Sequence, residues 1–252
     1  MTLSIMSFLI SCTENDRTSI APSNADPYKE VLLEMGFQEE YIEIVSGGYL
    51  VEGDLLYTRE VLEPFLQNDE TADKHRSICP SGSGFPLNID NVSNVEFFLD
   101  HNTLPTFWII QLKAAIDEYN ALEGTAISMR WRKIMPGTTY DGPNQCLVRA
   151  EYNYSTSANA WVQPRPCLSG EIGWELVINL ATNSGSPEQR KQISMHEMAH
   201  VIGFHHTNTS QGTYISGTCV DDPLSIVHTD GWGSPPVFTT CDVEAFQLAY
   251  PD

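Results

Sequence analysis

The stretch HEMAHVIGFHH, at residues 196–206, decides how the rest of the chain is interpreted. On a helix, residues four apart lie on one face, so His196 and His200 can present their imidazoles to a single metal ion. Gly203 permits the positive-φ turn that ends such a helix, and His206 then follows as the third ligand. Three protein ligands leave the fourth position of a tetrahedral zinc ion to water. The spacing therefore predicts one open Zn²⁺ site.

Glu197 stands next to the first predicted ligand and supplies the carboxylate that hydrolysis requires. Its side chain leaves the helix about 100° round from His196, so it is a poor ligand and fits the role of a base. An open zinc site activates water and polarises a carbonyl, while a nearby carboxylate takes the water proton and passes it to the leaving amine. We therefore predict peptide-bond hydrolysis with Glu197 as the catalytic residue. His205 is the weaker candidate ligand, because the spacing selects His206.

The pattern HExxHxxGxxH is the zinc signature of the metzincin metallopeptidases, and the chain resembles this family. The residues of the motif, with HVIGFHHT from His200 onward, resemble those of the bacterial dual-action HEIGH metallopeptidases. More loosely, the resemblance extends from Pro105 to Pro251. It implies a metzincin-like α+β fold, in which a twisted mixed sheet of about five strands packs on an N-terminal helix and the active-site helix, with a C-terminal helix. It also implies that residues 160–163 form an edge strand that pairs with an extended substrate.

The hydrophobic pattern outside the motif favours the same α+β class. Apolar residues recur at spacings of three and four after Pro105, which predicts a helix that packs one face on a sheet. The helix that carries the motif is predicted to begin at Ser186, where a capping box is possible with Gln189. The other expected elements are strands at 126–134, 147–154, 160–163 and 175–180, and a C-terminal helix at 241–250 with Thr239 or Thr240 as its cap.

One feature departs from the family pattern, because metzincins place a methionine in a tight turn beneath the zinc. This chain has no methionine after position 198, and Val227 stands where one is expected. An apolar residue can replace the methionine in packing, so the departure bears on the subfamily and not on the ligands. His228 is interpreted as an ordinary turn histidine. Tyr214 and Tyr250 are candidate transition-state donors by type only, and a structural role is the favoured interpretation for both.

The N-terminus resembles a lipoprotein-type signal at residues 1–12. Its apolar run ends in Leu9-Ile10-Ser11-Cys12, the pattern of a bacterial lipobox, so Cys12 would be lipidated. The alternatives are a plain secretory signal or an ordinary apolar N-terminus, since no Lys or Arg precedes the run. We expect an exported protein of the bacterial cell envelope, at the outer membrane or surface, or otherwise a secreted one.

Residues 13–86 form an acidic lead segment, prosegment-like and followed by a linker, ahead of a zinc metallopeptidase domain at 87–252. Short helical patterns occur at 28–35 and 60–66, an alternating stretch lies between them at 48–57, and Gly, Ser and Pro punctuate 79–86. Metzincin zymogens block their zinc with a prosegment Cys or Asp, and two residues here fit by resemblance. They are Cys79 and Asp54, the latter in a Gly-Asp pair similar to that of astacin prosegments. The alternatives are a disulfide for Cys79 and a solvated turn for Asp54.

The cysteine usage is typical of an exported protein. Five cysteines besides Cys12 are widely spaced and never form a C-x-x-C pair. Because five is an odd number, one thiol lacks an intramolecular partner, and the sequence leaves the pairing open. Proximity along the chain favours Cys146–Cys167 and Cys219–Cys241, which leaves Cys79.

The composition of the 252 residues narrows the class of function. With 13 Lys and Arg against 33 Asp and Glu, the formal net charge is −20, which repels nucleic acids and anionic lipid surfaces. The chain is 41% hydrophobic, enough for a folded core, yet no run approaches the roughly 18 apolar residues of a membrane-spanning helix. We expect a monomer that acts on a protein or peptide substrate, binds no nucleic acid and meets the membrane only through an anchor at Cys12.

Two other functions remain compatible with these patterns. One is a surface lipoprotein that keeps the zinc site as structure and acts as a binding or adhesion module. The other is a zinc amidase acting on cell-wall peptides. The presence of Glu197 disfavours the first, because a structural zinc site needs no base and is closed by a fourth protein ligand. The second is not excluded by the sequence.

Overall fold

The computed structural model describes residues 26–66, 87–164, 170–182, 185–208, 214–219, 222–229 and 236–252. The predicted signal at 1–12, Cys12, Cys79, the linker at 79–86 and Cys167 all lie outside these ranges. Within them, no helix has the length and apolar character that crossing a membrane requires. Helices and strands share the larger of two hydrophobic clusters, so the α+β class is confirmed.

Five strands of the C-terminal domain (residues 87–252) form the sheet that the metzincin resemblance implies. In spatial order they are β7 (Ala160–Gln163), β8 (Glu175–Asn179), β6 (Gln145–Glu151), β4 (Val95–Leu99) and β5 (Met129–Lys133). Strands β8, β6, β4 and β5 run parallel to their neighbours, and only β7 is antiparallel to β8. The strand predicted at 160–163 is therefore the last strand that this domain itself contributes on that side.

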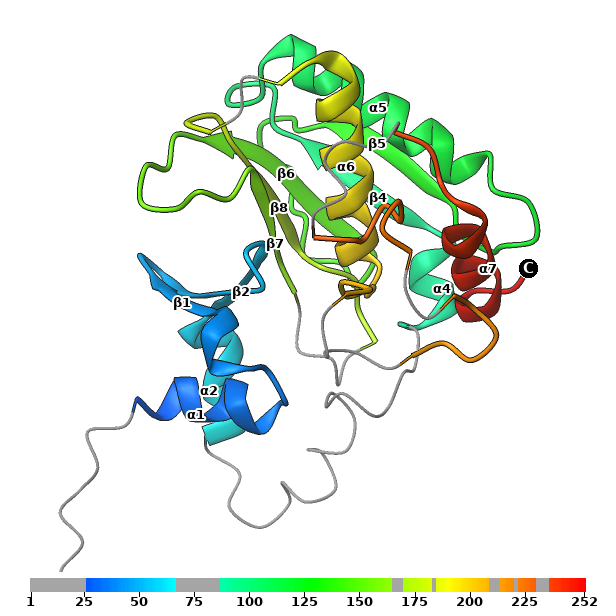
Figure 1. Ribbon diagram of the computed structural model, residues 1–252. Coiled ribbons are helices and arrows are strands. Elements are labelled where there is room, and N and C mark those ends of the chain that lie inside the picture. Colours follow the sequence, from blue (N-terminus) through cyan, green and yellow to red (C-terminus); the bar gives the residue numbers. More distant parts are fainter. Residues whose placement is uncertain are drawn as a thin grey trace, which may run out of the picture.

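Two long helices lie over one face of the sheet (Figure 1), and the apolar spacing after Pro105 predicted this packing for the first of them. They are α5 (Thr106–Asn120), which follows Pro105, and α6 (Pro187–Val201), which carries the first two predicted ligands. Ser186 and Gln189 form the predicted capping box at the start of α6. The C-terminal helix α7 (Thr240–Ala249) begins with a second capping box, in which Thr239 is the cap.

The lead segment forms helices where the patterns at 28–35 and 60–66 indicate them, and it also joins the sheet, which the sequence patterns did not predict. It contributes α1 (Pro27–Glu34), the short 3₁₀ helix η1 (Glu39–Tyr41) and α2 (Arg59–Leu66). Between them lies a three-stranded meander that extends the sheet to eight strands, in the order β1-β2-β3-β7-β8-β6-β4-β5. Its strands are β1 (Ile42–Val45), β2 (Gly48–Val51) and β3 (Leu55–Thr58).

Strand β4 and the short helix α4 (Ile89–Val92) were also missed by sequence reasoning. All five residues of β4 are buried between two parallel neighbours, so the strand shows no alternation of polar and apolar positions. The lead segment shares the core with the C-terminal domain, since Val31, Leu32 and Tyr57 belong to the same apolar cluster as α5 and α6. Removing this segment would therefore uncover apolar surface.

The cysteine predictions have one outcome within the described residues. Cys219 and Cys241 form a disulfide, with 5.6 Å between their Cα atoms, as predicted. Cys146 is buried in β6. Its proposed partner Cys167 and the remaining Cys79 lie outside the described ranges, so this pairing stays a prediction.

Removing the bridge has a predictable cost. We expect replacement of both Cys219 and Cys241 by Ser to lower the free energy of unfolding by about 3 kcal/mol, because the bridge restrains two residues 22 positions apart in the unfolded chain. Denaturant titration followed by circular dichroism measures the change. The wild type in reductant is the control, and a double variant as stable as the oxidised wild type would contradict the expectation.

Candidate metal centre

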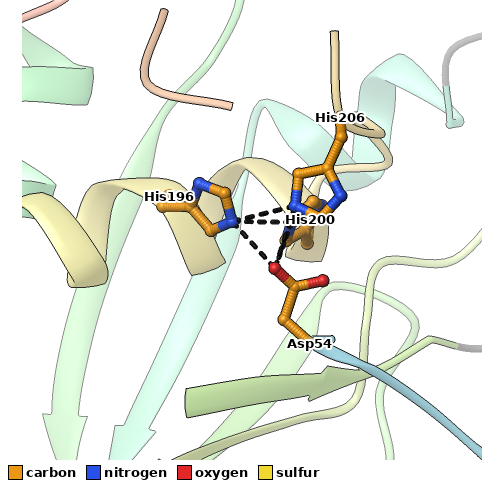
Figure 2. A group of neighbouring side chains, drawn as sticks. All are labelled: Asp54, His196, His200 and His206. Carbon is orange, nitrogen blue, oxygen red and sulfur yellow. Dashed lines mark hydrogen bonds and ion pairs between the residues drawn. The ribbon is translucent and has the colours of Figure 1, made fainter. Parts of the chain in front are cut away.

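The three predicted ligands meet at the end of α6 (Figure 2). His196 and His200 lie one turn apart, and Gly203, with φ at 91°, ends the helical path so that His206 returns to them. The Nε2 atom of His200 lies 3.1 Å from that of His196 and 3.2 Å from that of His206. The third pair, His196 and His206, is also 3.2 Å apart. Glycine suits this positive φ, and a Cβ at position 203 would in addition crowd the side chain of Leu87 at 3.0 Å.

The hydrogen bonds of the Nδ1 atoms determine whether the Nε2 atoms, which face the centre, carry a proton. Nδ1 of His196 contacts the carbonyl oxygen of Ile226 at 2.6 Å, and Nδ1 of His200 contacts that of Phe204 at 2.6 Å. A carbonyl only accepts, so each Nδ1 carries the proton and each Nε2 presents a lone pair to the centre. Lone pairs facing one another at this distance repel unless positive charge lies between them. Nε2 atoms on a tetrahedral zinc ion, at about 2.0–2.1 Å from the metal, are about 3.3 Å apart, so the donor set fits zinc.

A fourth group completes the arrangement, and it comes from the lead segment. Asp54 Oδ2 lies 3.0 Å from Nε2 of His196, 2.9 Å from that of His206 and 3.5 Å from that of His200. These four side chains form a buried group able to hold a metal ion. Asp54 thus lies 142 residues from His196 in the chain and beside it in space. The interpretation of Asp54 as a solvated turn residue is wrong, because its side chain is buried against the histidines.

Charge at this centre follows from burial and from the carboxylates around it. Burial would raise the pKa of Asp54, but the three histidines hold it well below its usual range. Burial would lower the pKa of His206, yet the carboxylates of Asp54 and Glu52, one at each ring nitrogen, raise it to about 9. Both shifts show that the centre favours positive charge, whether supplied by a proton or by a metal ion.

Glu197 lies beside the centre without contributing to the group of four. Its side chain is 1% exposed, and its Oε2 atom has no hydrogen-bond partner among the described residues. Burial, together with the nearby charge of Asp54, raises the pKa of Glu197 well above its usual range. A buried carboxyl group that holds a proton readily and has an open hydrogen-bonding position is suited to proton transfer.

The weaker candidates from the sequence lie elsewhere. His205 is outside the group of four, packs against Phe37 of the lead segment at 6.3 Å between rings, and has a pKa lowered by burial to about 4. His228 is half-buried and also outside the group. The hydroxyl of Tyr214 donates to the carbonyl of Thr218, and that of Tyr250 donates to Ile202 and accepts from the amide of Leu87. The Tyr250 contacts join the ends of the C-terminal domain and are structural.

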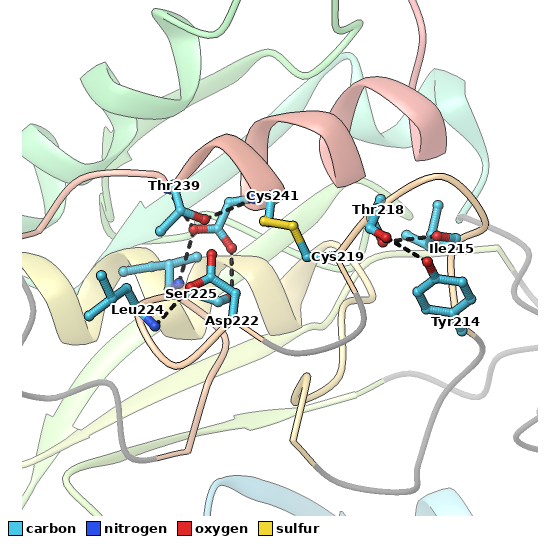
Figure 3. Close-up of a disulfide and its surroundings, with 11 residues drawn as sticks. Tyr214, Ile215, Thr218, Cys219, Asp222, Leu224, Ser225, Thr239 and Cys241 are labelled. Carbon is cyan, nitrogen blue, oxygen red and sulfur yellow. Dashed lines mark hydrogen bonds between the residues drawn. A yellow bond between two sulfur atoms is a disulfide. The ribbon is translucent and has the colours of Figure 1, made fainter.

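The turn beneath the ligands carries Val227 and is held by α7. Val227 is buried, its carbonyl accepts from the amide of Thr207, and the preceding Ile226 carbonyl holds His196. Asp242, at the third position of α7, accepts from the Ser225 hydroxyl at 2.6 Å and from the Ile226 amide at 3.1 Å. The disulfide that ends at Cys241 lies next to this network (Figure 3). Asp242 was missed by sequence reasoning, although the T-x-x-D pattern at 239–242 marks it as a capping residue.

The ligand assignment predicts the effect of losing one imidazole. We expect His206→Ala to weaken zinc binding by more than about 100-fold, because even the loss of a ligand's outer partner costs 10- to 100-fold. Competition with a chromophoric chelator measures the affinity. The matched controls are His205→Ala and His228→Ala, which remove imidazoles outside the group of four. Full zinc occupancy in the His206 variant would redirect the assignment to one of these two.

The edge strand implied by the family resemblance is covered by the lead segment. Strand β3 pairs with β7 in parallel, with Leu55 opposite Val162. The amide of Val162 donates to the carbonyl of Asp54 at 2.8 Å. The backbone at Asp54 and Leu55 therefore pairs with the open side of β7, and the side chain of Asp54 contacts the histidines.

No protein-family model and no curated protein matches the chain. Solved structures that match it include myroilysin, at 14% identity and a TM-score of 0.42, with 64% of this chain and 84% of that chain covered. A second is high choriolytic enzyme 1, a hatching-enzyme zinc protease of the medaka fish Oryzias latipes, at 13% identity, a TM-score of 0.42 and coverages of 68% and 96%. A third is archaemetzincin of Methanopyrus kandleri, at 16% identity, a TM-score of 0.33 and coverages of 62% and 96%.

Proposed function

We propose that the chain is an exported zinc-dependent endopeptidase, present here in a latent form. One zinc ion would be held by His196, His200 and His206, and Glu197 would be the catalytic residue. The observation that carries this proposal is the convergence of three imidazole Nε2 atoms beside a buried carboxyl group that has an open hydrogen-bonding position. A structural zinc site would not require that carboxyl group.

The side chains divide the work of hydrolysis between them. A zinc ion at the three histidines would polarise the scissile carbonyl and activate its bound water. Glu197 Oε2 takes the proton of the attacking water and passes it to the nitrogen of the leaving amine. The raised pKa of Glu197 favours its uptake of that proton. Ile226 and Phe204 keep two of the imidazoles in the tautomer that presents Nε2 inward.

Substrate would bind along β7 in the place that β3 now takes. An extended peptide can add a strand to an open sheet edge through main-chain hydrogen bonds. Val162, whose amide now donates to Asp54, would then donate to the substrate backbone. The edge strand and the histidines are adjacent, so a peptide paired with β7 would carry one of its bonds to the metal centre.

The lead segment would keep the enzyme latent until it is removed. Asp54 Oδ2 lies close to all three Nε2 atoms, where the fourth zinc ligand would be, and β3 takes up the substrate edge. Both features block the same site, the first by ligation and the second by strand pairing. Activity therefore requires displacement of residues on both sides of Asp54.

Metal removal tests the proposed activity directly. After removal of the lead segment, we expect the chain to cleave members of a peptide library, to lose all cleavage in excess chelator and to regain it with one equivalent of zinc. Mass spectrometry of the products identifies the bonds. Including cell-wall peptides separates a general endopeptidase from a zinc amidase. A processed chain that binds zinc and cleaves none of these substrates would contradict the proposal and favour a binding module.

Export and anchoring belong to the same proposal. The lipobox pattern ending at Cys12 supports lipidation, and the Cys219–Cys241 disulfide supports an oxidising compartment. In a bacterial host fed a labelled fatty acid, the wild-type chain should incorporate label and Cys12→Ser should not. Label in the Cys12 variant would contradict an anchor at this residue.

A further inference from the structure

We propose that Glu52 of the lead segment is a positioning residue for His206, so that the lead segment strengthens zinc binding as well as blocking the site. This inference rests on the zinc site proposed above. It assigns the segment a second role, in loading the metal, that is separate from the blocking role of Asp54.

The three histidines differ in what holds their outer nitrogens. Nδ1 of His196 and Nδ1 of His200 each donate to a backbone carbonyl of the C-terminal domain, at 2.6 Å. Nδ1 of His206 instead contacts Oε2 of Glu52 at 3.2 Å. The third imidazole is therefore oriented by a side chain 154 residues away, in the lead segment. A carboxylate at the outer nitrogen also makes the imidazole a more basic ligand than a carbonyl does.

Glu52 makes this contact from a backbone conformation that glutamate rarely adopts. Glu52 and Gly53 lie in the tight loop between β2 and β3, with φ at 55° and 93°. Consecutive positive φ values at the centre of a hairpin turn favour Asn-Gly. Glu52 is the one described residue other than glycine with positive φ. Here a residue that suits the turn poorly occupies the position from which its side chain reaches His206, which points to a functional role for that side chain.

The burial of Glu52 also supports a role at the metal centre. Its side chain is 0% exposed, and its second oxygen, Oε1, has no hydrogen-bond partner among the described residues. A buried carboxylate is costly unless opposite charge compensates for it. The compensating charge available here is that of the metal centre, which Glu52 meets through His206. The hairpin loop thus places one carboxylate at each ring nitrogen of His206, Glu52 at Nδ1 and Asp54 at Nε2.

This arrangement predicts an order of events. The site would bind zinc most tightly while the lead segment is in place, and the metal would be acquired before the segment is removed. The consequence can be tested in the full chain, because Glu52 can be altered while Asp54 stays.

The decisive variant is Glu52→Asn, which suits the positive-φ turn better but is too short by one methylene to reach His206. We expect its zinc affinity to fall 10- to 100-fold, measured by competition with a chromophoric chelator. The variant should stay folded without metal at the temperature of the titration, which thermal unfolding followed by circular dichroism checks. Glu52→Gln keeps the length of the side chain and loses its charge, so its zinc affinity should lie between those of Glu52→Asn and the wild type. Glu43→Gln, at an exposed position of β1, is the matched control and should bind zinc like the wild type.

Cobalt substitution gives a second measurement, since the visible spectrum of bound Co²⁺ reports ligand geometry. A shifted spectrum in Glu52→Asn, with that of Glu43→Gln unchanged, supports the proposal. Equal zinc affinity in Glu52→Asn and the wild type overturns it, as does a loss of metal-free stability that accounts for the loss of affinity. A wild type that binds no zinc would instead refute the proposed function, so the two failures are distinguishable.

Discussion

Replacing Glu197 with Gln should lower peptide hydrolysis by the processed chain about 10²- to 10⁴-fold, the range that general acid–base catalysis contributes. The substituted amide would keep the shape of the side chain but could neither take the water proton nor return it to the leaving amine. Because Glu197 lies outside the group of four, zinc content should stay at the wild-type level. The measurement is kcat/KM on a peptide identified from the library, together with metal analysis.

The control for this prediction lies on the same helix. Glu188 is in the exposed first turn of α6, far along the helix from the ligands, and Glu188→Gln should cleave like the wild type. Loss of zinc together with activity in Glu197→Gln would assign a metal-binding role to this carboxylate. Cleavage that survives the substitution would refute the proposed mechanism.

The second large effect concerns the unprocessed chain. Asp54→Ala should raise the peptide hydrolysis of the intact full-length protein about 10- to 100-fold, the size of effect that one contact at a metal site has on activity, because water can then take the fourth position. Asp54 Oδ2 contacts two of the three Nε2 atoms at 3.0 Å or less, so its removal frees the position of the fourth ligand. The activity should stay below that of the processed chain, since β3 still pairs with β7 and the lead segment still shares the core.

Two checks make this result specific. Gel electrophoresis after the assay must show an intact chain, because contaminating processed protein would imitate the effect. Glu60→Gln removes an exposed carboxylate from α2 of the same segment and should leave the protein latent. Unchanged latency in Asp54→Ala would show that strand pairing at β7 alone blocks the site, and Asp54 would lose its assigned role.

The sequence predicted most of what depends on neighbouring residues. The i, i+4 spacing places His196 and His200 on one helical face, and Gly203 returns the chain to bring in His206, whatever the rest of the fold does. The caps at Ser186 and Thr239 were likewise readable, because a capping box is formed by residues three apart. Strand β4 was not predicted, because a strand buried on both faces has no alternation of polar and apolar residues.

What the sequence could not decide was which of two lead-segment residues reaches the histidines. Cys79 and Asp54 each matched a family pattern, and a turn carrying Gly-Asp is often solvated. The pairing of β3 with β7 explains the outcome for Asp54, because it places the loop between β2 and β3 at the metal centre. The carboxylates of Glu52 and Asp54 are buried there.

Local patterns thus predicted the three histidines that converge, the carboxyl group beside them and the helices that carry them, because helical spacing and capping depend on residues within a turn or two of one another. The folded chain adds three contacts that these patterns did not predict: Asp54 faces all three imidazoles, Glu52 contacts the third, and β7 is already paired. Such contacts join residues more than a hundred positions apart, and they arise from strand pairing and shared burial, which no local pattern records.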